Sequence, residues 1–221
     1  MQRKTRDILK VKLRRFAVCV GFGTAMAVPA HAHPHVFIDA RAEFRFNTAE
    51  ELDKIRITWI YDAFTSLTLM AILDLDDDND TVLSEADRAR IVQAQTIWPD
   101  DFEGDTYLET AGQSVGFGKP LNGSSDMLDG RIWVSFDLPL LDPLVVTDAV
   151  ELRLFDPTYY YAYSAIGVGS SNACDAEVRP FEPSAATSGL QAQLVKLSRE
   201  ETPEQENVGR LFADVITLTC N

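Results

Sequence analysis

Histidine, cysteine and long apolar runs are all scarce in this 221-residue chain. Its three histidines lie within five residues, His31–His35, and it has three cysteines. The body of the chain therefore cannot supply the histidine of a Ser-His-Asp or Cys-His catalytic group. The sequence also has no CxxC pair and no glycine-rich phosphate loop. No apolar stretch reaches the roughly 20 residues that a membrane-spanning helix needs.

The first 32 residues have the layout of a signal peptide. Seven basic residues precede the uncharged apolar run of residues 16–28, and the small-x-small triplet Ala30-His31-Ala32 follows it. Signal peptidases cut after such triplets. We therefore expect an exported mature chain, residues 33–221, that begins at His33. An uncleaved N-terminal anchor is the alternative.

Positive charge is rare in the expected mature chain. Cleavage after Ala32 removes seven of the 20 basic residues and one of the 34 acidic residues, which leaves 13 against 33 and a net charge of −20. Nucleic acid and an anionic membrane surface are not expected as partners, because both require clustered Lys and Arg. Such a surface favours cations instead.

Cysteine usage agrees with export. Cys19 leaves with the signal peptide, and the mature chain keeps Cys174 and Cys220. An even number of cysteines in an oxidising compartment predicts a disulfide between the two. A thiolate metal site is the alternative, although no suitable spacing supports it.

Period-two alternation of apolar and polar residues predicts strands over 36–46, 55–61, 132–138 and 150–154, and residues 215–220 suit a closing strand. Helices are expected over 64–75, 84–98 and 183–199. For the first helix we expect Asp62 as N-cap and Phe64, Leu67 and Ile72 facing inward. The second opens on Ser84-Glu85-Ala86-Asp87, which resembles a capping box. These elements predict an α+β fold in a single domain, mainly antiparallel sheet with a helix-loop-helix insertion and a C-terminal helix.

The expected new N-terminus, His33-Pro34-His35, is a candidate metal site. In an extended chain His33 and His35 project from the same face about 6–7 Å apart, and the freed α-amine adds a third nitrogen. Pro34 has no N–H, which excludes a square-planar site built from backbone amides. A carboxylate such as Asp39 or Asp62 would complete a set that suits zinc, nickel, cobalt or copper. Histidines that merely flank a cleavage site are the alternative.

The acidic stretch of residues 76–87 matches the spacing of a twelve-residue EF-hand calcium loop. Its candidate ligands are Asp76, Asp78, Asp80, the carbonyl of Val82, Ser84 and Asp87. Thr81 stands where such loops carry glycine, and Asp87 replaces the longer glutamate, so weak, stabilising calcium binding is expected. A second frame would run from Asp74 to Glu85. A solvated acidic loop is the alternative.

Several segments resemble the DUF1007 family of bacterial exported proteins. They are HPHVFIDA at 33–40, ITWIYDAFTS at 57–66, DLDDDNDTVLS at 74–84, FDLPL at 136–140, FDPTYYYAY at 155–163 and the two late cysteines. The resemblance implies a periplasmic component of an uncharacterised transport system, associated with inner-membrane permeases for nickel, cobalt or zinc. It singles out His33, His35, Asp62, Asp156 and Tyr159 as site residues. From the sequence itself, the tyrosines of FDPTYYYAY fit core packing as well as a pocket.

Together these features predict a periplasmic protein, and not an enzyme, that binds a divalent transition metal at its processed N-terminus. The expected partner is an inner-membrane metal permease. One alternative is an enzyme that holds redox-active copper at the terminal histidine, with Tyr159 as its neighbour. Another is a structural or interaction module whose only ion is calcium in the acidic loop.

Overall fold

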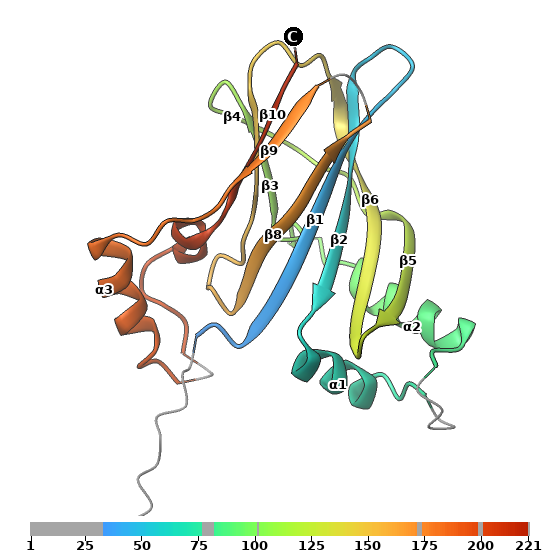
Figure 1. Ribbon diagram of the computed structural model, residues 1–221, viewed down its shortest axis with the longest axis vertical. Helices are drawn as coiled ribbons and strands as arrows, with labels where there is room; N and C mark the ends of the chain where they lie inside the picture. The colour runs from blue at the N-terminus through green and yellow to red at the C-terminus, as the bar shows by residue number, and fades with distance from the viewer. Residues whose placement is uncertain (1–32, 77–81, 101, 172–173, 199–200, 221) are drawn as a thin grey trace, which may run out of the picture. The chain divides into compact units, whose positions relative to one another are not determined.

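Two five-stranded β-sheets form most of the computed structural model (Figure 1). The structure describes residues 33–76, 82–100, 102–171, 174–198 and 201–220, so the predicted signal peptide lies outside the described residues. The strands are β1 (Val36–Phe46), β2 (Leu52–Tyr61), β3 (Thr106–Thr110), β4 (Gln113–Val115), β5 (Leu121–Leu128), β6 (Arg131–Leu144), β7 (Val150–Leu154), β8 (Tyr161–Ser170), β9 (Asp175–Arg179) and β10 (Val215–Thr219). The helices are α1 (Ala63–Ile72), α2 (Glu85–Thr96), α3 (Ala185–Leu194) and the 3₁₀ helix η1 (Val208–Phe212). None of the helices among these residues is long and apolar enough to cross a membrane.

The first sheet has the strand order β5-β6-β2-β1-β8. Ile38, Ala40, Ala42 and Phe44 of β1 are buried, which confirms the period-two prediction for this strand. β1 pairs antiparallel with β2 and parallel with β8, with Val36 opposite Tyr161. The residues that precede β1 therefore lie beside the turn that precedes β8.

The second sheet has the order β4-β3-β7-β10-β9, and its strand pairs are antiparallel. The predicted strands at 150–154 and 215–220 are confirmed as β7 and β10. The prediction of a mainly antiparallel sheet is confirmed as well, in the form of two sheets. The strands β3, β4, β5, β8 and β9 were not predicted.

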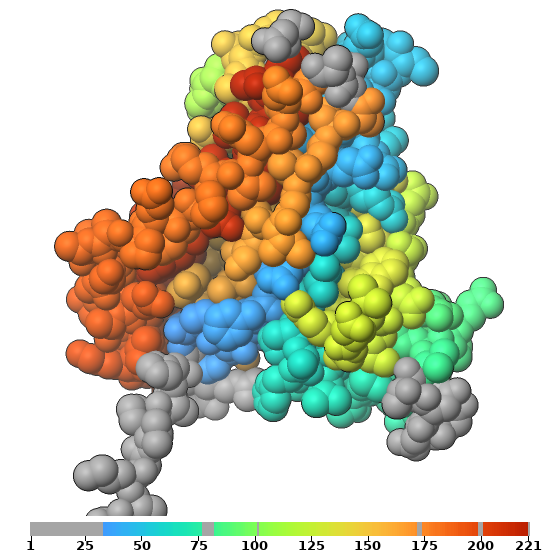
Figure 2. Space-filling view, in the orientation of Figure 1, coloured from blue at the N-terminus to red at the C-terminus, as the bar shows by residue number. Residues whose placement is uncertain are grey.

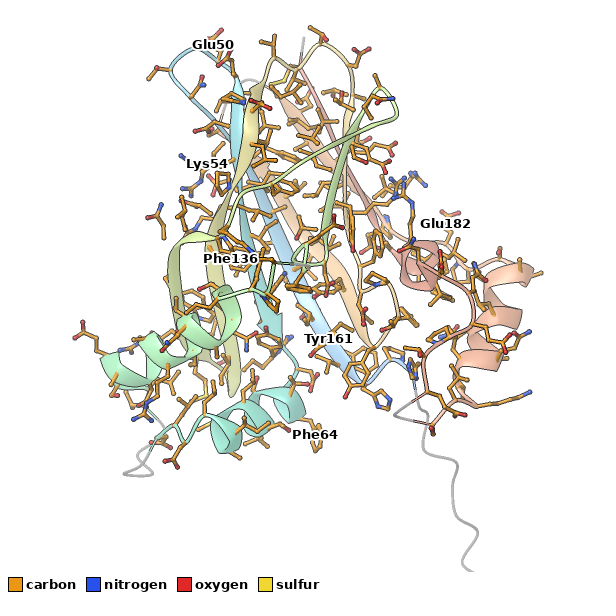
Figure 3. All side chains as sticks on the ribbon, turned by 180° about the vertical axis from the view of Figure 1, so that it is seen from behind. Glu50, Lys54, Phe64, Phe136, Tyr161 and Glu182 are labelled. Carbon is orange, nitrogen blue, oxygen red and sulfur yellow. A yellow bond between two sulfur atoms is a disulfide. The ribbon has the colours of Figure 1, made fainter. Side chains whose placement is uncertain are left out.

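The main core consists of the side chains that the two sheets bury against each other. Phe136 of β6 is fully buried and lies between the sheets (Figure 3). Its ring contacts Trp59 and Trp98 at centroid distances of 4.9 and 5.4 Å. Leu152 of β7 and Ile216 of β10 belong to the same cluster from the second sheet. Each such side chain contributes about 1.5–3 kcal/mol through burial of apolar surface.

Helix α2 begins as predicted. Ser84 and Asp87 form the capping box: each side chain accepts a hydrogen bond from the other residue's backbone N–H, at 3.2 and 3.0 Å. The helix packs on β5, where the Ser125 hydroxyl donates to the Arg88 carbonyl at 2.8 Å. Gly123 permits this approach, because a Cβ at that position would overlap the Val92 side chain.

Helix α1 exposes the side that we expected it to bury. Phe64, Leu67 and Ile72 are 77%, 64% and 72% exposed, so the prediction that they face inward is wrong. Figure 3 shows Phe64 on the side of the helix away from the sheets. The packed side is instead fixed by the buried Ser66, whose hydroxyl accepts the Ile132 N–H at 2.8 Å. Leu69, Met70 and Leu73 share that side and pack on the core.

A smaller cluster joins α3 and η1 near the C-terminal end of the chain. Phe212 stacks on Tyr159 at 4.5 Å, and Leu194 of α3 is buried beside them. Leu190 and Leu197 pack against the same cluster. Helix α3 lies within the third helix that the sequence predicted, over 183–199. This cluster holds the segment before β8 in place.

The predicted disulfide between Cys174 and Cys220 is confirmed. It joins the residue before β9 to the residue after β10, with the two Cα atoms 4.3 Å apart and 46 residues of separation. A cross-link of this kind typically contributes about 2–4 kcal/mol to stability.

Candidate metal centre

His33 and His35 come together immediately before β1, next to the turn that leads into β8. Their ring centroids are 5.1 Å apart with an interplanar angle of 64°. The backbone N–H of His35 donates to the Tyr160 carbonyl at 2.9 Å, and that of Val36 to the same oxygen at 3.2 Å. In Figure 2 the start of β1 (blue) reaches the surface between α3 (orange) and α1 (cyan). We call these two residues the histidine pair.

The geometry of the histidine pair fits a shared transition-metal ion. Imidazole nitrogens bind zinc at about 2.0–2.1 Å, and tetrahedral coordination of two rings then places their centroids roughly 5 Å apart. The observed separation of 5.1 Å agrees with this value. His33 is only 3% exposed, and its Nδ1 atom is buried without a hydrogen-bond partner among the described residues. A buried ring nitrogen without a partner is costly, and a metal ion would satisfy it.

Two rings alone do not complete a metal site. Within the described part of the chain, no group of three or more His, Cys, Asp or Glu side chains is arranged to hold a metal ion. The further ligand that the sequence suggests is the α-amine of His33. That amine exists only if the chain is cut after Ala32, a position outside the described residues.

Tyr160 is the aromatic neighbour of the histidine pair. Its ring lies 4.7 Å from the His35 ring and 6.2 Å from the His33 ring. Sequence reasoning missed this residue, although it belongs to the run of three tyrosines at 159–161. The adjacent residue, Tyr159, had been singled out instead.

Tyr159 lies in the small C-terminal cluster, where its ring stacks on Phe212. Its backbone has a φ angle of 60°, in the left-handed region that non-glycine residues rarely adopt. This turn interrupts the extended geometry just before β8. The structure therefore brings Tyr160, rather than Tyr159, to the histidine pair.

Asp156 organises the turn that carries these tyrosines. Its carboxylate is almost fully buried and accepts hydrogen bonds from the backbone N–H groups of Thr158, Tyr160 and Tyr161 at 2.8–3.1 Å. The Thr158 hydroxyl donates to the same carboxylate. Asp156 therefore positions Tyr160 beside the histidine pair, and its oxygens are already engaged. We call residues 156–161 the tyrosine turn.

Asp62 is the N-cap of α1, as predicted. Its carboxylate accepts hydrogen bonds from the Thr65 N–H at 2.9 Å, the Thr65 hydroxyl at 2.6 Å and the Phe37 N–H at 3.1 Å. Burial acts to raise the pKa of Asp62, but these hydrogen bonds outweigh it and hold the pKa below its usual value. The Phe37 bond ties α1 to β1 two residues after His35. Asp62 thus supports the position of the pair.

Asp39 forms an ion pair instead of turning toward the histidines. Its Oδ2 atom is 2.7 Å from Nη1 of Arg131 on β6. Arg131 also donates to the carbonyls of Tyr61 and Ile60 at 2.7 and 3.0 Å. The Asp39 carboxylate therefore belongs to a cross-strand network on the first sheet.

An aromatic cavity lies beside Tyr160. It has a volume of about 570 Å³, and Tyr160 is one of its walls. The further aromatic residues that line it are Trp59, Tyr61, Trp98, Phe102, Tyr161 and Tyr163. This cavity has no local signal in the sequence, because its walls come from β2, β8 and the segment after α2, which are distant in the chain.

Asp105 is a buried acid in the wall of the aromatic cavity. It is 5% exposed and accepts a hydrogen bond from the Tyr163 hydroxyl at 2.8 Å. Burial raises the pKa of Asp105 to about 7; the Tyr163 hydrogen bond opposes this rise, and the negative charge of Asp156 adds to it. Burial, together with Asp105, raises the pKa of Tyr163 well above its ordinary value. Tyr163 therefore remains a hydrogen-bond donor at neutral pH.

The predicted calcium loop is only partly within the described residues. Asp78 and Asp80 lie outside them. The Asp87 carboxylate accepts hydrogen bonds from the Ser84 hydroxyl and N–H, which hold its pKa below the usual value. Helices α1 and α2 flank the loop as predicted. Calcium binding at residues 76–87 stays a prediction, which melting curves with and without EGTA would test.

The described residues form a two-sheet β protein in which His33 and His35 lie together immediately before the first strand. The chain belongs to the DUF1007 family, described as "Protein of unknown function (DUF1007)", whose sequence profile matches residues 18–220. The match covers nearly the whole chain and confirms the resemblance seen in the sequence. Among curated proteins, none matches it.

Proposed function

We propose that the mature protein is a periplasmic accessory protein that binds a divalent transition metal, nickel, cobalt or zinc, for a membrane transport system. The ligands are the rings of His33 and His35 and the α-amine of His33. The observation that carries the proposal is the approach of the two imidazoles to 5.1 Å beside Tyr160, with a buried His33 nitrogen that has no partner in the described structure.

The elements around the histidine pair support a preorganised site. The Tyr160 carbonyl accepts from the His35 backbone, and the Phe37 N–H is bonded to Asp62. These bonds fix the chain on both sides of His35. A site that is ordered before the metal arrives loses less conformational entropy on binding.

Charge supports a cationic ligand. The expected mature chain has a net charge of −20, which raises the local concentration of divalent cations at its surface. An inner-membrane metal permease is the partner that the resemblance implies. In this proposal the protein delivers the ion to the permease or receives it from the permease.

The proposal is tested by calorimetric titration of the mature protein, residues 33–221, with Zn²⁺, Ni²⁺ and Co²⁺. We expect one ion per chain, and a large loss of affinity in His33→Ala and His35→Ala. Removal of a hydrogen-bond partner of a metal ligand typically costs about 10–100-fold, so removal of a ligand should cost about 100-fold or more. Equal metal affinity in the wild type and in the double variant that carries both substitutions would refute the proposal.

Three control variants separate the parts of the site. A glycine added before His33 keeps both rings and displaces the amine, so we expect it to weaken binding. Asp39→Asn should leave the affinity unchanged, because this carboxylate is paired with Arg131. Tyr160→Phe keeps the ring and removes the hydroxyl, and it shows whether the phenol is a ligand.

The transport role needs a cellular measurement. Cells that produce only the double variant with alanine at 33 and 35 should take up or export less radioactive nickel or zinc than cells with the wild-type chain. If metal binding is lost in vitro while transport is unchanged, the site binds metal but does not serve transport.

A further inference from the structure

The aromatic cavity has the size and the walls of a binding site for a small organic molecule. Its volume of about 570 Å³ lies within the range of roughly 300–1,000 Å³ that is usual for such sites. Trp59 and Tyr61 come from β2, Tyr161 and Tyr163 from β8, and Trp98 from the segment after α2. The walls therefore belong to elements that the fold fixes independently of any ligand.

The charged residues that line the cavity are all acidic. They are Asp105 and Asp156, and no Lys, Arg or His of the described chain is among the lining residues. Aromatic ring faces carry negative electrostatic potential and attract cations. The ring faces and the carboxylates therefore both favour a positively charged ligand.

The two carboxylates have different roles. Asp156 holds the tyrosine turn and is saturated by Thr158, Tyr160 and Tyr161. Asp105 accepts from the Tyr163 hydroxyl, and a carboxylate has capacity for further hydrogen bonds or for an ion pair. Burial disfavours its ionised form, and a bound cation would restore that form.

The chemistry of the walls selects an organic cation over a metal ion. Calcium or a transition metal requires several oxygen or nitrogen ligands at about 2.0–2.6 Å. The cavity offers mainly ring faces, and one of its two carboxylates is already engaged. An alkylated ammonium ion needs no such ligand set, because it is attracted by ring faces at distances up to about 6 Å.

We propose that the aromatic cavity binds a small organic ammonium ion, with its nitrogen against the rings of Trp59, Trp98 and Tyr161 and opposite the carboxylate of Asp105. This site is separate from the histidine pair, although Tyr160 is common to both. It gives the protein a second ligand, of a class that the metal proposal does not include.

The test compares choline with 3,3-dimethyl-1-butanol, which has the same shape and no charge. Two of the chain's three tryptophans, Trp59 and Trp98, line the cavity, so intrinsic fluorescence reports binding, and calorimetry checks it. In EDTA-treated protein we expect choline to bind about tenfold or more tightly than the neutral compound, the effect of a desolvated cation–π contact. Asp105→Asn should weaken choline about tenfold and leave the neutral compound unchanged.

Two controls keep the result interpretable. Asp142→Asn removes an exposed carboxylate outside the cavity and should leave choline affinity unchanged. The His33→Ala variant should bind choline like wild type, so a failure of the metal proposal would not affect this result. Equal affinity for choline and its neutral analogue, or no choline binding up to tens of millimolar in protein with a wild-type unfolding curve, would overturn the proposal.

Discussion

Asp105→Asn changes a buried acid into a neutral side chain of the same shape. Asp105 is 5% exposed at the edge of the aromatic cavity, and asparagine can still accept the Tyr163 hydroxyl through its amide oxygen. The substitution therefore removes the ionisation and keeps the hydrogen bond. Any change in the pH dependence of stability can then be assigned to the carboxyl group.

The sign and the size of the effect follow from the two pKa values. In the unfolded chain the pKa of Asp105 is the ordinary 3.8, and in the folded protein it is raised to about 7. Between these pH values the folded protein holds a proton that the unfolded chain has lost. The stabilisation is complete below pH 3.8 and is lost as the pH rises to about 7. The full loss is about 4 kcal/mol, at about 1.4 kcal/mol per pKa unit, and about 2–3 kcal/mol of it falls between pH 5 and pH 8.

The measurement is urea unfolding of both proteins, followed by tryptophan fluorescence at intervals from pH 5 to pH 8. We expect Asp105→Asn to gain stability relative to wild type by about 2–3 kcal/mol over this range. Asp142→Asn, which removes an exposed carboxylate, is the matched control and should show no such trend. A difference between Asp105→Asn and wild type that stays constant from pH 5 to pH 8 would refute the reasoning.

Three further predictions concern stability. Replacement of both Cys174 and Cys220 by serine should lower the free energy of unfolding by about 4 kcal/mol, because the disulfide closes a loop whose chain entropy corresponds to this value. Urea denaturation of the variant and of the oxidised wild type measures the difference. Gly209→Ala should destabilise the fold by more than 2 kcal/mol, about the cost of serious overpacking, because a Cβ there would overlap the Asp156 carbonyl; a wild-type melting temperature would contradict this. Phe64→Ala, on the exposed side of α1, should change the free energy of unfolding by less than about 0.5 kcal/mol. Ile91→Ala, at a buried position of α2, should lower it by about 2–5 kcal/mol. Similar losses in the two variants would show that this side of α1 is covered in solution.

Sequence patterns identified the strands that bury one whole face. β1, β2, β6 and β7 alternate clearly, because each turns one apolar face to the core. The strand β5, with the sequence LNGSSDML, is polar, and β8 contains Gly167 and Gly169. Their extended conformation comes from pairing with β6 and β1, and a strand of this kind has no strong local signal.

The orientation of α1 shows a second limit of pattern reading. The helix AFTSLTLMAI has apolar residues on two sides, so its periodicity does not select the buried one. The selection is made by Ser66, whose hydroxyl accepts the N–H of Ile132 on β6. A polar residue that pairs with a distant strand therefore decides which apolar side packs.

The candidate site could be predicted in part. The histidine pair was found because all the histidines of the chain gather at one point, and Asp62 was found as a cap. The structure places Tyr160 beside the histidine pair and Tyr159 against Phe212, and the backbone between them turns at Tyr159, with φ of 60°. No sequence pattern indicated that Asp105 is buried, since a single acid before a short strand is common. Its burial depends on residues from three segments that are distant in the chain.

The tyrosine turn determines how the two proposed sites relate. Tyr160 forms a wall of both, so a turn that became ordered only on ligand binding would couple them. Contacts within the fold hold this turn, through hydrogen bonds to Asp156 from Thr158, Tyr160 and Tyr161. Gly209 packs against the same segment, close to the Asp156 carbonyl. Because the turn becomes ordered when the chain folds, the binding of neither ligand is weakened by the loss of conformational entropy in the turn. The shared wall therefore preorganises both sites without making the occupancy of one depend on the other.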